Sequence, residues 1–244
     1  GMDGYVVGDP DGGAGIYTAN PNECCYDTDD DGVPDIYSYV DTAFFVGANN
    51  YDYFQQHGMS DLQLTYAPHV VDNRRFSNNA EAHEEEARRW RTSLGIPQES
   101  VVFLFVGKLI DLKSPLLLLQ AFQKLPHDRK PHLVYVGNGD CESKLRAQAA
   151  DADNVHFIPF QNQSRMPVVY RLGDVVCLPS GSETWGLVVN EAMASGRPVI
   201  VSDKVGCARD LVANQKTGFI HKAQCQLSLL HAMKKCQDRN ELVS

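Results

Sequence analysis

The segment VVCLPSGSETWGLVVNEAMASGRPVIV, residues 175–201, places a helical pattern between two short apolar runs. We expect strands over Val175–Leu178 and Val199–Val201 and a helix over Leu187–Ser195. Strands that are apolar at every position need cover on both faces, which a parallel sheet between two layers of helices provides. The segment therefore predicts part of a parallel sheet with helical connections.

The same alternation extends to both sides of this segment. Further apolar runs predict strands over Val101–Val106, His132–Val136, Val155–Ile158 and Gly218–Ile220. The helical patterns lie over Pro115–Leu125, Glu142–Ala150, Met166–Leu172 and Ala208–Ala213. Regular alternation of strands and helices indicates an α/β fold built on a doubly wound parallel sheet.

The N-terminal part has a different composition. Residues up to about Pro34 are rich in Gly, Asp, Asn and Pro without a sustained apolar period, which predicts loop. We expect short strands over Thr42–Gly47 and Leu62–Ala67, with a short helix over Asn50–His57 between them. Ala80–Leu94 is then predicted to be an amphipathic helix, with acids leading and bases trailing as the helix dipole favours.

The charges are distributed unevenly along the chain. There are 22 Lys and Arg against 31 Asp and Glu, a net charge of −9, yet residues 1–73 hold 13 of the acids and no Lys or Arg. Without a clustered basic stripe the chain lacks the electrostatic footprint of a nucleic-acid-binding protein, so we expect no nucleic-acid partner. The apolar runs are far shorter than the ~20 residues of a membrane helix, so no integral membrane segment is expected.

Cysteine usage bears on the compartment. The seven cysteines include no CxxC pair, which suggests neither a zinc knuckle nor a complete disulfide framework. No basic-then-apolar leader opens the chain. We therefore expect a cytoplasmic protein.

Glycines and lysines follow the predicted strands, at the edge where α/β sheets bind ligands. Gly107, Lys108 and Lys113 follow the strand at Val101–Val106, and two cations beside a helix entrance can hold a diphosphate. The alternative is two solvated lysines in a loop. Gly137 opens a partial glycine-rich turn after the next strand, which is weak as a dinucleotide signature and on its own predicts only a tight turn.

The loop after Val175–Leu178 carries a stronger signal. Glu183 lies in the loop, Trp185 and Gly186 precede the expected helix, and Glu191 lies about one turn inside it. The free amides of a first helical turn and the positive end of the dipole bind phosphate groups. Glu191 can accept hydrogen bonds from a ribose diol, and Glu183 can reach hydroxyls beyond the phosphates. The alternative is two ordinary surface acids, but Glu191 is flanked by apolar residues, which favours a ligand.

These residues carry a resemblance to a known family. Glu183 and Glu191, with seven residues between them and AMASGRPVIVSD (192–203) after them, resemble the E-x7-E region of retaining GT-B glycosyltransferases of family 4. Upstream, the run from Gly107-Lys108 to Lys113 lies where that family has a G-R-L…K-G segment. The similarity covers about residues 41–222. It implies a Rossmann-like, nucleotide-sugar-binding C-terminal domain over residues 79–244.

The resemblance implies a role for each matching position. Glu183 would be the catalytic residue, contacting the donor hexose and stabilising the developing oxocarbenium charge. The nucleotide diphosphate sugar would be held by two glycine turns, two lysines, a helix entrance and a second acid: Gly107, Lys108, Lys113, Gly137, Trp185, the backbone of Gly186, Leu187 and Val188, Glu191 for the ribose, and the backbone at Phe160 for the base. No cofactor or metal ion is required for such a transfer.

Three positions depart from the family pattern. Lys108 replaces the usual arginine, which keeps the charge but loses the planar bidentate fork. Ser114 and Pro159 stand where glycine is common, which weakens the expectation that a ligand approaches the backbone there.

The resemblance also implies a missing part. GT-B enzymes have two Rossmann-like domains, and the N-terminal one supplies the acceptor site. Residues 41–78 resemble only its last strand-helix-strand and the interdomain linker, and residues 1–40 are expected to be an acidic, loop-rich extension. On this prediction the acceptor domain is absent from the chain, the isolated chain is inactive, and an acceptor domain or chain must be its partner.

The acidic extension contains one further motif. Asp27, Asp29, Asp31 and Asp35 follow the pattern D-x-D-x-D-G-x-x-D, in which alternate carboxylates converge on a hard cation. It resembles calcium loops of the thrombospondin-repeat or dockerin kind, although Ser38 stands where an EF-hand has its bidentate Glu. A structural Ca²⁺ ion and a solvated acidic loop both fit the pattern.

The leading hypothesis is the donor-binding half of a retaining glycosyltransferase of the kind used in polysaccharide biosynthesis. It would move a hexose from a UDP- or GDP-sugar to a glycan, lipid or other acceptor. The alternative is a non-catalytic nucleotide-sugar-binding subunit that needs a separate acceptor-domain partner. A GT-B relative with other chemistry, such as an epimerase, is disfavoured by the paired glutamates.

Overall fold

The computed structural model describes residues 6–8, 14–16, 37, 39–126, 130–213 and 216–237. The chain divides into two compact units, residues 1–68 and residues 69–244. The boundary predicted between residues 78 and 79 falls inside the second unit. The predicted calcium ligands Asp27, Asp29, Asp31 and Asp35 lie outside the described residues, so that hypothesis stays a prediction.

The first unit contains two small sheets. β1 (Val6–Gly8) pairs antiparallel with β2 (Ala14–Ile16), so the expectation of loop throughout this region was wrong there. The β-branched residues of these segments favour extended backbone. β3 (Ala43–Phe45) runs parallel to β4 (Leu64–Tyr66), with α1 (Ala48–Gln56) between them, which confirms the predicted strand-helix-strand order.

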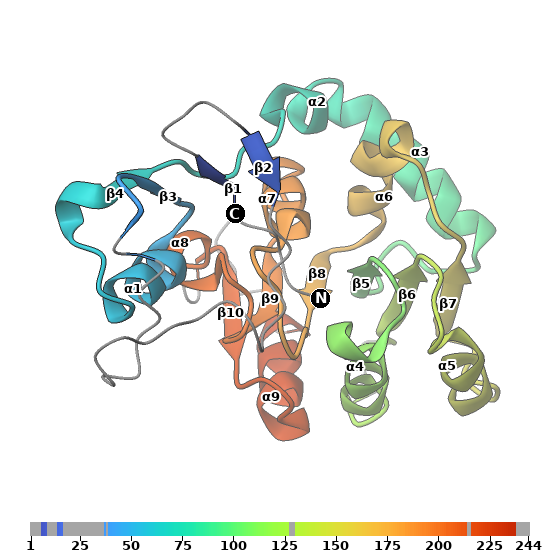
Figure 1. Cartoon of the computed structure of the whole chain (residues 1–244). Helices are drawn as coiled ribbons and strands as arrows, with labels where there is room; N and C mark the ends of the chain where they lie inside the picture. The colour runs from blue at the N-terminus through green and yellow to red at the C-terminus, as the bar shows by residue number, and fades with distance from the viewer. Residues whose placement is uncertain are drawn as a thin grey trace. The chain divides into compact units, whose positions relative to one another are not determined.

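The second unit is built on a six-stranded sheet whose described strands are all parallel, in the order β10-β9-β8-β5-β6-β7. These strands are β5 (Val102–Val106), β6 (His132–Val136), β7 (Val155–Ile158), β8 (Val175–Leu178), β9 (Val199–Ser202) and β10 (Gly218–His221). The chain starts at the centre, moves out to β7, returns to β8 beside β5, and moves out again to β10 (Figure 1). This confirms the doubly wound sheet and puts the point where the strand order reverses between β5 and β8.

Helices cover both faces of this sheet (Figure 1). On one face lie α4 (Pro115–Phe122), α5 (Glu142–Gln148) and α9 (Gln226–Gln237), which share a buried core with Phe103, Phe105 and Tyr135. On the other lie α3 (Ala80–Ser93), α6 (Met166–Leu172), α7 (Leu187–Ala194) and the short α2 (Asn73–Ser77). α8 (Ala208–Leu211) connects β9 to β10.

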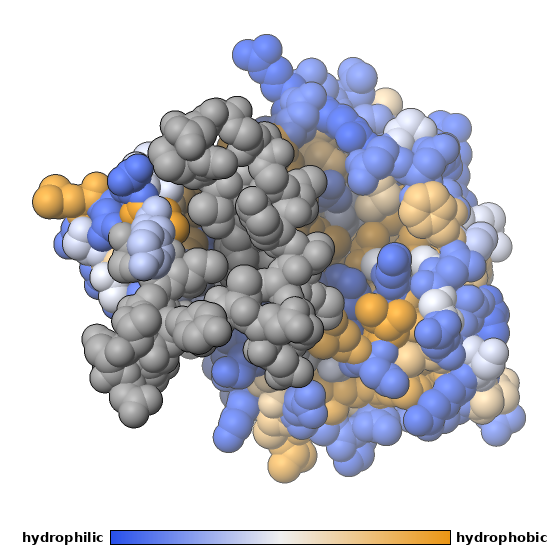
Figure 2. Space-filling model, in the orientation of Figure 1, coloured by the Kyte–Doolittle hydropathy of each residue, from blue (hydrophilic) through white to orange (hydrophobic). Residues whose placement is uncertain are grey.

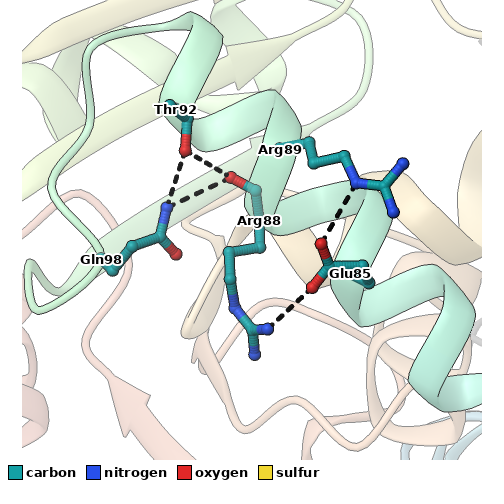
Figure 3. Close-up of polar contacts among 5 residues, drawn as sticks. All are labelled: Glu85, Arg88, Arg89, Thr92 and Gln98. Atoms are coloured by element: carbon teal, nitrogen blue, oxygen red, sulfur yellow. Dashed lines mark hydrogen bonds and ion pairs between the residues drawn. The ribbon is translucent and has the colours of Figure 1, made fainter.

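The outer face of α3 is solvated, as its charge pattern predicts. Glu85 pairs with Arg88 and Arg89 one turn further along the helix, at 2.9 and 3.1 Å, and Gln98 donates to the carbonyl oxygen of Arg88 and to the Thr92 hydroxyl (Figure 3). In Figure 2, hydrophilic residues dominate the upper right edge, where α3 lies in Figure 1. Exposed pairs of this kind add little to stability because water screens them.

The inner face of α3 is tied to the sheet through a buried arginine. Arg91 donates from Nε to the carbonyl oxygen of Leu172 at 2.8 Å and pairs with Asp174 at 3.2 Å. The second oxygen of Asp174 accepts the backbone N–H of Val102 at 2.8 Å, at the start of β5. One charged pair therefore joins α3, the end of α6 and the central strand.

Candidate functional site

A cavity of about 790 Å³ opens beside the carboxyl ends of the strands of the second unit. Its wall comes from the turns after β5, β6 and β7 and from the facing sides of α6 and α7. Seven of the ten ligand-binding residues predicted from the sequence line it, namely Gly107, Lys108, Gly137, Phe160, Leu187, Val188 and Glu191. The structure thus brings together residues that are spread over 85 positions of the chain (107–191).

Two glycines let the turns after β5 and β6 touch. A Cβ atom added to Gly137, whose φ is +139°, would lie 2.0 Å from the carbonyl oxygen of Gly107. The two turns are also joined by hydrogen bonds from the Gly107 amide to the Val136 carbonyl oxygen, at 3.0 Å, and from Leu109 to Asn138, at 2.9 Å. The close approach explains why glycine is needed at position 137, which the sequence indicated only as a tight turn.

The entrance of α7 lies at the cavity. Gly186, in the left-handed region with a φ of +94°, is the N-cap residue of the helix and has no side chain with which to cap the first turn. Leu187 and Val188 belong to that turn and line the cavity. Uncapped first-turn amides and the positive end of the dipole suit an anionic group such as phosphate.

Glu191 lies one turn further along α7 and receives a hydrogen bond that the sequence did not suggest. The hydroxyl of Tyr170, on α6, donates to Oε2 of Glu191 at 2.5 Å. Tyr170 has no solvent-exposed surface. Burial raises the pKa of Tyr170 well above its usual value, and the neighbouring Glu191 carboxylate adds to that effect. The phenol therefore stays protonated and acts as a donor. The available signal was a tyrosine in a short helix whose other residues, Arg171 apart, are apolar.

Lys113 and Glu183 form an ion pair with each other. Nζ of Lys113 lies 2.6 Å from Oε2 of Glu183, and each side chain is 21% exposed. Glu183 is held in place by backbone hydrogen bonds to the segment after β9, from its amide to Lys204 and from Gly206 to its carbonyl oxygen. The aliphatic part of Lys113 lies over Gly107, next to the cavity wall. Neither charged residue lines the cavity itself.

Two predicted contacts differ in their surroundings. Trp185 is buried and does not line the cavity. Its indole N–H donates to Oδ1 of Asn190 at 2.9 Å, and its ring lies near His69. In this structure its contacts are therefore packing contacts within the domain. Phe160 is 73% exposed and lines the cavity, and its backbone amide donates to Oδ1 of Asn138 at 2.6 Å. Ser114 adopts a φ of +51°, which fits its place at a position where glycine is common.

The described residues contain no group of three or more His, Cys, Asp and Glu side chains placed to hold a metal ion. Within the same residues, no helix combines the length and the apolar character needed to span a bilayer.

A family model matches residues 86–242, and its description is glycosyl transferases group 1. The chain belongs to this family. The match runs from α3 to the end of α9 and includes every element that lines the cavity. The Rossmann-like parallel sheet with helices on both faces is that of the GT-B glycosyltransferases, as the sequence predicted.

Curated relatives agree with the family assignment. A D-inositol 3-phosphate glycosyltransferase from Mycobacteroides abscessus is 38% identical over 138 residues, which cover 53% of this chain and 30% of that protein. An uncharacterised glycosyltransferase from Methanocaldococcus jannaschii is 34% identical over 138 residues, covering 55% of this chain and 35% of that protein. The chain therefore spans about a third of the length of these two relatives.

Solved structures share the fold at low identity. HepE from Anabaena, in complex with UDP and glucose, superimposes with a TM-score of 0.69 at 19% identity, covering 82% of this chain and 55% of that one. The C-terminal domain of a glycosyl transferase group 1 family protein from Francisella tularensis gives a TM-score of 0.56 at 20% identity, covering 70% of this chain and 90% of that one.

Proposed function

We propose that this chain provides the donor-binding half of a retaining glycosyltransferase that transfers a hexose from a nucleotide diphosphate sugar. The observation that supports this most directly is the convergence of Lys108, the first turn of α7 with Leu187 and Val188, and Glu191 on one cavity. The amides and the lysine suit a diphosphate, and the carboxylate suits a ribose diol. The exposed ring of Phe160 offers a face on which a base can stack.

The sugar is then placed beyond the phosphates, toward the Lys113–Glu183 pair. A departing diphosphate gains negative charge, which Lys108, Lys113 and the α7 entrance would stabilise. The donor carbon gains positive charge, which the Glu183 carboxylate would stabilise. Most of the rate enhancement in such a site comes from positioning and fixed electrostatics.

A UDP- or GDP-sugar is the proposed donor. HepE, which shares this fold, was solved with UDP and glucose, and that favours testing UDP first. The acceptor, a glycan, lipid or other hydroxyl compound, would be bound by a domain other than the six-stranded unit. The second candidate is a subunit that binds the nucleotide sugar without turning it over; the Lys113–Glu183 ion pair favours it, because in this arrangement both groups are already engaged.

Calorimetric titration with UDP, GDP and ADP tests the donor site. We expect one of the three to bind and, at ~100 times its dissociation constant, to stabilise the protein by about 2.7 kcal/mol. Glu191→Gln should weaken that binding by about tenfold, because a charged hydrogen-bond acceptor is lost. Glu142→Gln is the matched control: it neutralises an acid in the first turn of α5 that pairs with Arg146, outside the cavity. If none of the three nucleotides binds, the donor-site proposal is wrong.

Turnover separates the two candidates. The chain would be incubated with UDP-glucose and an acceptor, alone and together with the acceptor domain of a related enzyme. Transfer only in the mixture supports the donor-half proposal, and binding without consumption in either supports the non-catalytic subunit. Transfer by the chain alone would contradict the need for a separate acceptor domain.

A further inference from the structure

Tyr170 lies behind the proposed ribose site and is fully buried. It belongs to α6, all of whose residues are buried, and its ring packs edge-on against Phe76 of α2 with 5.9 Å between the ring centroids. The backbone of α2 is in turn held by Arg171, which donates to the Phe76 carbonyl oxygen at 2.8 Å. The phenolic oxygen therefore has a fixed location in the cavity wall.

The one hydrogen bond that this oxygen donates goes to the acid that faces the cavity. The 2.5 Å contact with Oε2 of Glu191 is short, as bonds from a hydroxyl to a carboxylate are. Glu191 is half-buried and extends from the middle of α7, so an unanchored side chain at this position would sample several rotamers. Anchoring one oxygen restricts the rotamers and orientations that the carboxylate can adopt.

A vicinal diol needs the plane of the carboxylate to be fixed. Its two hydroxyls donate nearly parallel hydrogen bonds, which a carboxylate accepts best when both oxygens face the diol. A carboxylate offers about four acceptor positions, so one bond from Tyr170 leaves the diol enough. A group ordered before the ligand arrives loses less conformational entropy on binding.

We propose that Tyr170 is a positioning residue that orients the Glu191 carboxylate toward the 2′- and 3′-hydroxyls of the donor ribose. This inference rests on the proposed donor-binding function. On this inference a buried side chain contributes to the selectivity for a ribose over a sugar without the diol, although it contacts no hydroxyl of the ligand itself.

A purely structural role makes a different prediction. If Tyr170 only fills the core between α2 and α6, deleting its hydroxyl disturbs every nucleotide equally. If it orients Glu191, the loss appears only for ligands that carry the diol. Comparing a ribonucleotide with its dideoxy form separates the two roles.

The test is calorimetric titration of the full chain and its Tyr170→Phe variant with UDP, 2′,3′-dideoxy-UDP and inorganic diphosphate, and with the same pairs of GDP and ADP. We expect the wild-type chain to prefer the ribo form, and Tyr170→Phe to reduce that preference by about 5- to 10-fold, the range for one hydrogen bond to a charged group. Affinity for the dideoxy form and for diphosphate should stay within about twofold. In the Glu191→Gln background, Tyr170→Phe should have no further effect on the preference.

Tyr135→Phe is the matched control. Tyr135 is also fully buried and also donates one hydrogen bond, to the Pro115 carbonyl oxygen at 2.8 Å, but it does not line the cavity. It should lower the melting temperature without changing the ribo preference. Melting curves of both variants show that they are folded.

The outcomes are distinguishable. A Tyr170→Phe variant that retains the full ribo preference, or that loses affinity equally for ribo and dideoxy forms, overturns the positioning role and leaves the donor site standing. A wild-type chain that binds nucleotides without any ribo preference also overturns it. A wild-type chain that binds none of the nucleotides overturns the proposed function and this inference together.

Discussion

Replacing Gly137 by alanine tests whether the contact between two turns builds the cavity. The added Cβ would lie 2.0 Å from the carbonyl oxygen and 2.9 Å from the carbonyl carbon of Gly107, both closer than real Cβ contacts. The clash is with backbone, so no side chain can move aside to relieve it. The turns after β5 and β6 must separate instead.

Two costs add up in Gly137→Ala. A φ of +139° is a region that only glycine adopts readily, which costs ~1–3 kcal/mol for another residue. Forcing extra atoms into a packed contact costs about as much again. We therefore expect the free energy of unfolding to fall by about 4 kcal/mol, which for a domain of this size lowers the melting temperature by roughly 8–16 °C.

Gly196→Ala is the control for the conformational cost alone. Gly196 has a φ of +74°, but nothing lies within 4 Å of the position that a Cβ atom would take there, so only the left-handed backbone is penalised. That change should cost ~1–2 kcal/mol and leave nucleotide binding intact. Gly137→Ala should in addition lose nucleotide binding, because Gly107 and Asn138 form part of the cavity wall. Thermal melts with and without UDP measure both effects. If Gly137→Ala melts like Gly196→Ala and responds equally to UDP, the reasoning from the turn contact is refuted.

Three further changes address the charges of the domain. Glu183→Gln removes the charged partner of Lys113, so we expect UDP to bind a few-fold more tightly. We also expect sugar transfer, assayed with an acceptor domain present, to be lost. Unchanged affinity for UDP would show that the ion pair does not compete with the ligand. His156 stacks on His132, with a nitrogen of each ring 2.9 Å apart. Burial is the larger cause and the neighbouring charge of His132 the smaller cause that lower the pKa of His156 to about 4. As the pH falls from about 6.5 to about 4, the unfolded state therefore binds a proton at His156 that the folded state does not bind. The free energy of unfolding drops through that window by roughly 1–2 kcal/mol, after discounting for solvent screening. In a series of urea denaturations at different pH, His156→Asn should make this part of the curve flatter than in the wild type. Arg91→Met removes the buried member of the pair with the partly exposed Asp174 and the hydrogen bond to the Leu172 carbonyl oxygen, and should cost about 1–3 kcal/mol in urea denaturation. Arg89→Met, on the exposed face of α3, should cost less than about 0.5 kcal/mol.

The sheet was predictable because its strands are short and rich in β-branched residues, and the four inner strands β5, β6, β8 and β9 are buried on both faces. β6, β7 and β8 begin and end where the apolar runs predict, and the other strands of the second unit differ by one residue at one end. α9 was missed because its sequence, QLSLLHAMKKCQ, mixes polar residues into the apolar face without a clear capping signal. α2 spans only five residues, too few to show a helical period.

Only those features of the site that depend on neighbouring positions in the sequence were predictable. Gly186 before a helix and Glu191 inside it are readable from one strand-loop-helix segment, and strand exits meet at one edge in any parallel sheet. The pairing of Tyr170 with Glu191 depends on how α6 and α7 pack side by side, which no local pattern encodes. For Trp185, its place in the loop suggested ligand contact, which stays a prediction, and the structure shows a buried ring, as its size favours.

The two lysines predicted to hold the diphosphate are not equivalent in this structure. Lys108 is exposed and lines the cavity, so an approaching anion meets its charge first. Lys113 is engaged with Glu183, but its ammonium group has three N–H donors, so it can approach a phosphate oxygen while it still holds that carboxylate. A diphosphate that draws Lys113 away weakens its pairing with Glu183, the acid assigned to the sugar. Donor binding would then leave the Glu183 carboxylate less neutralised than it is in the empty site.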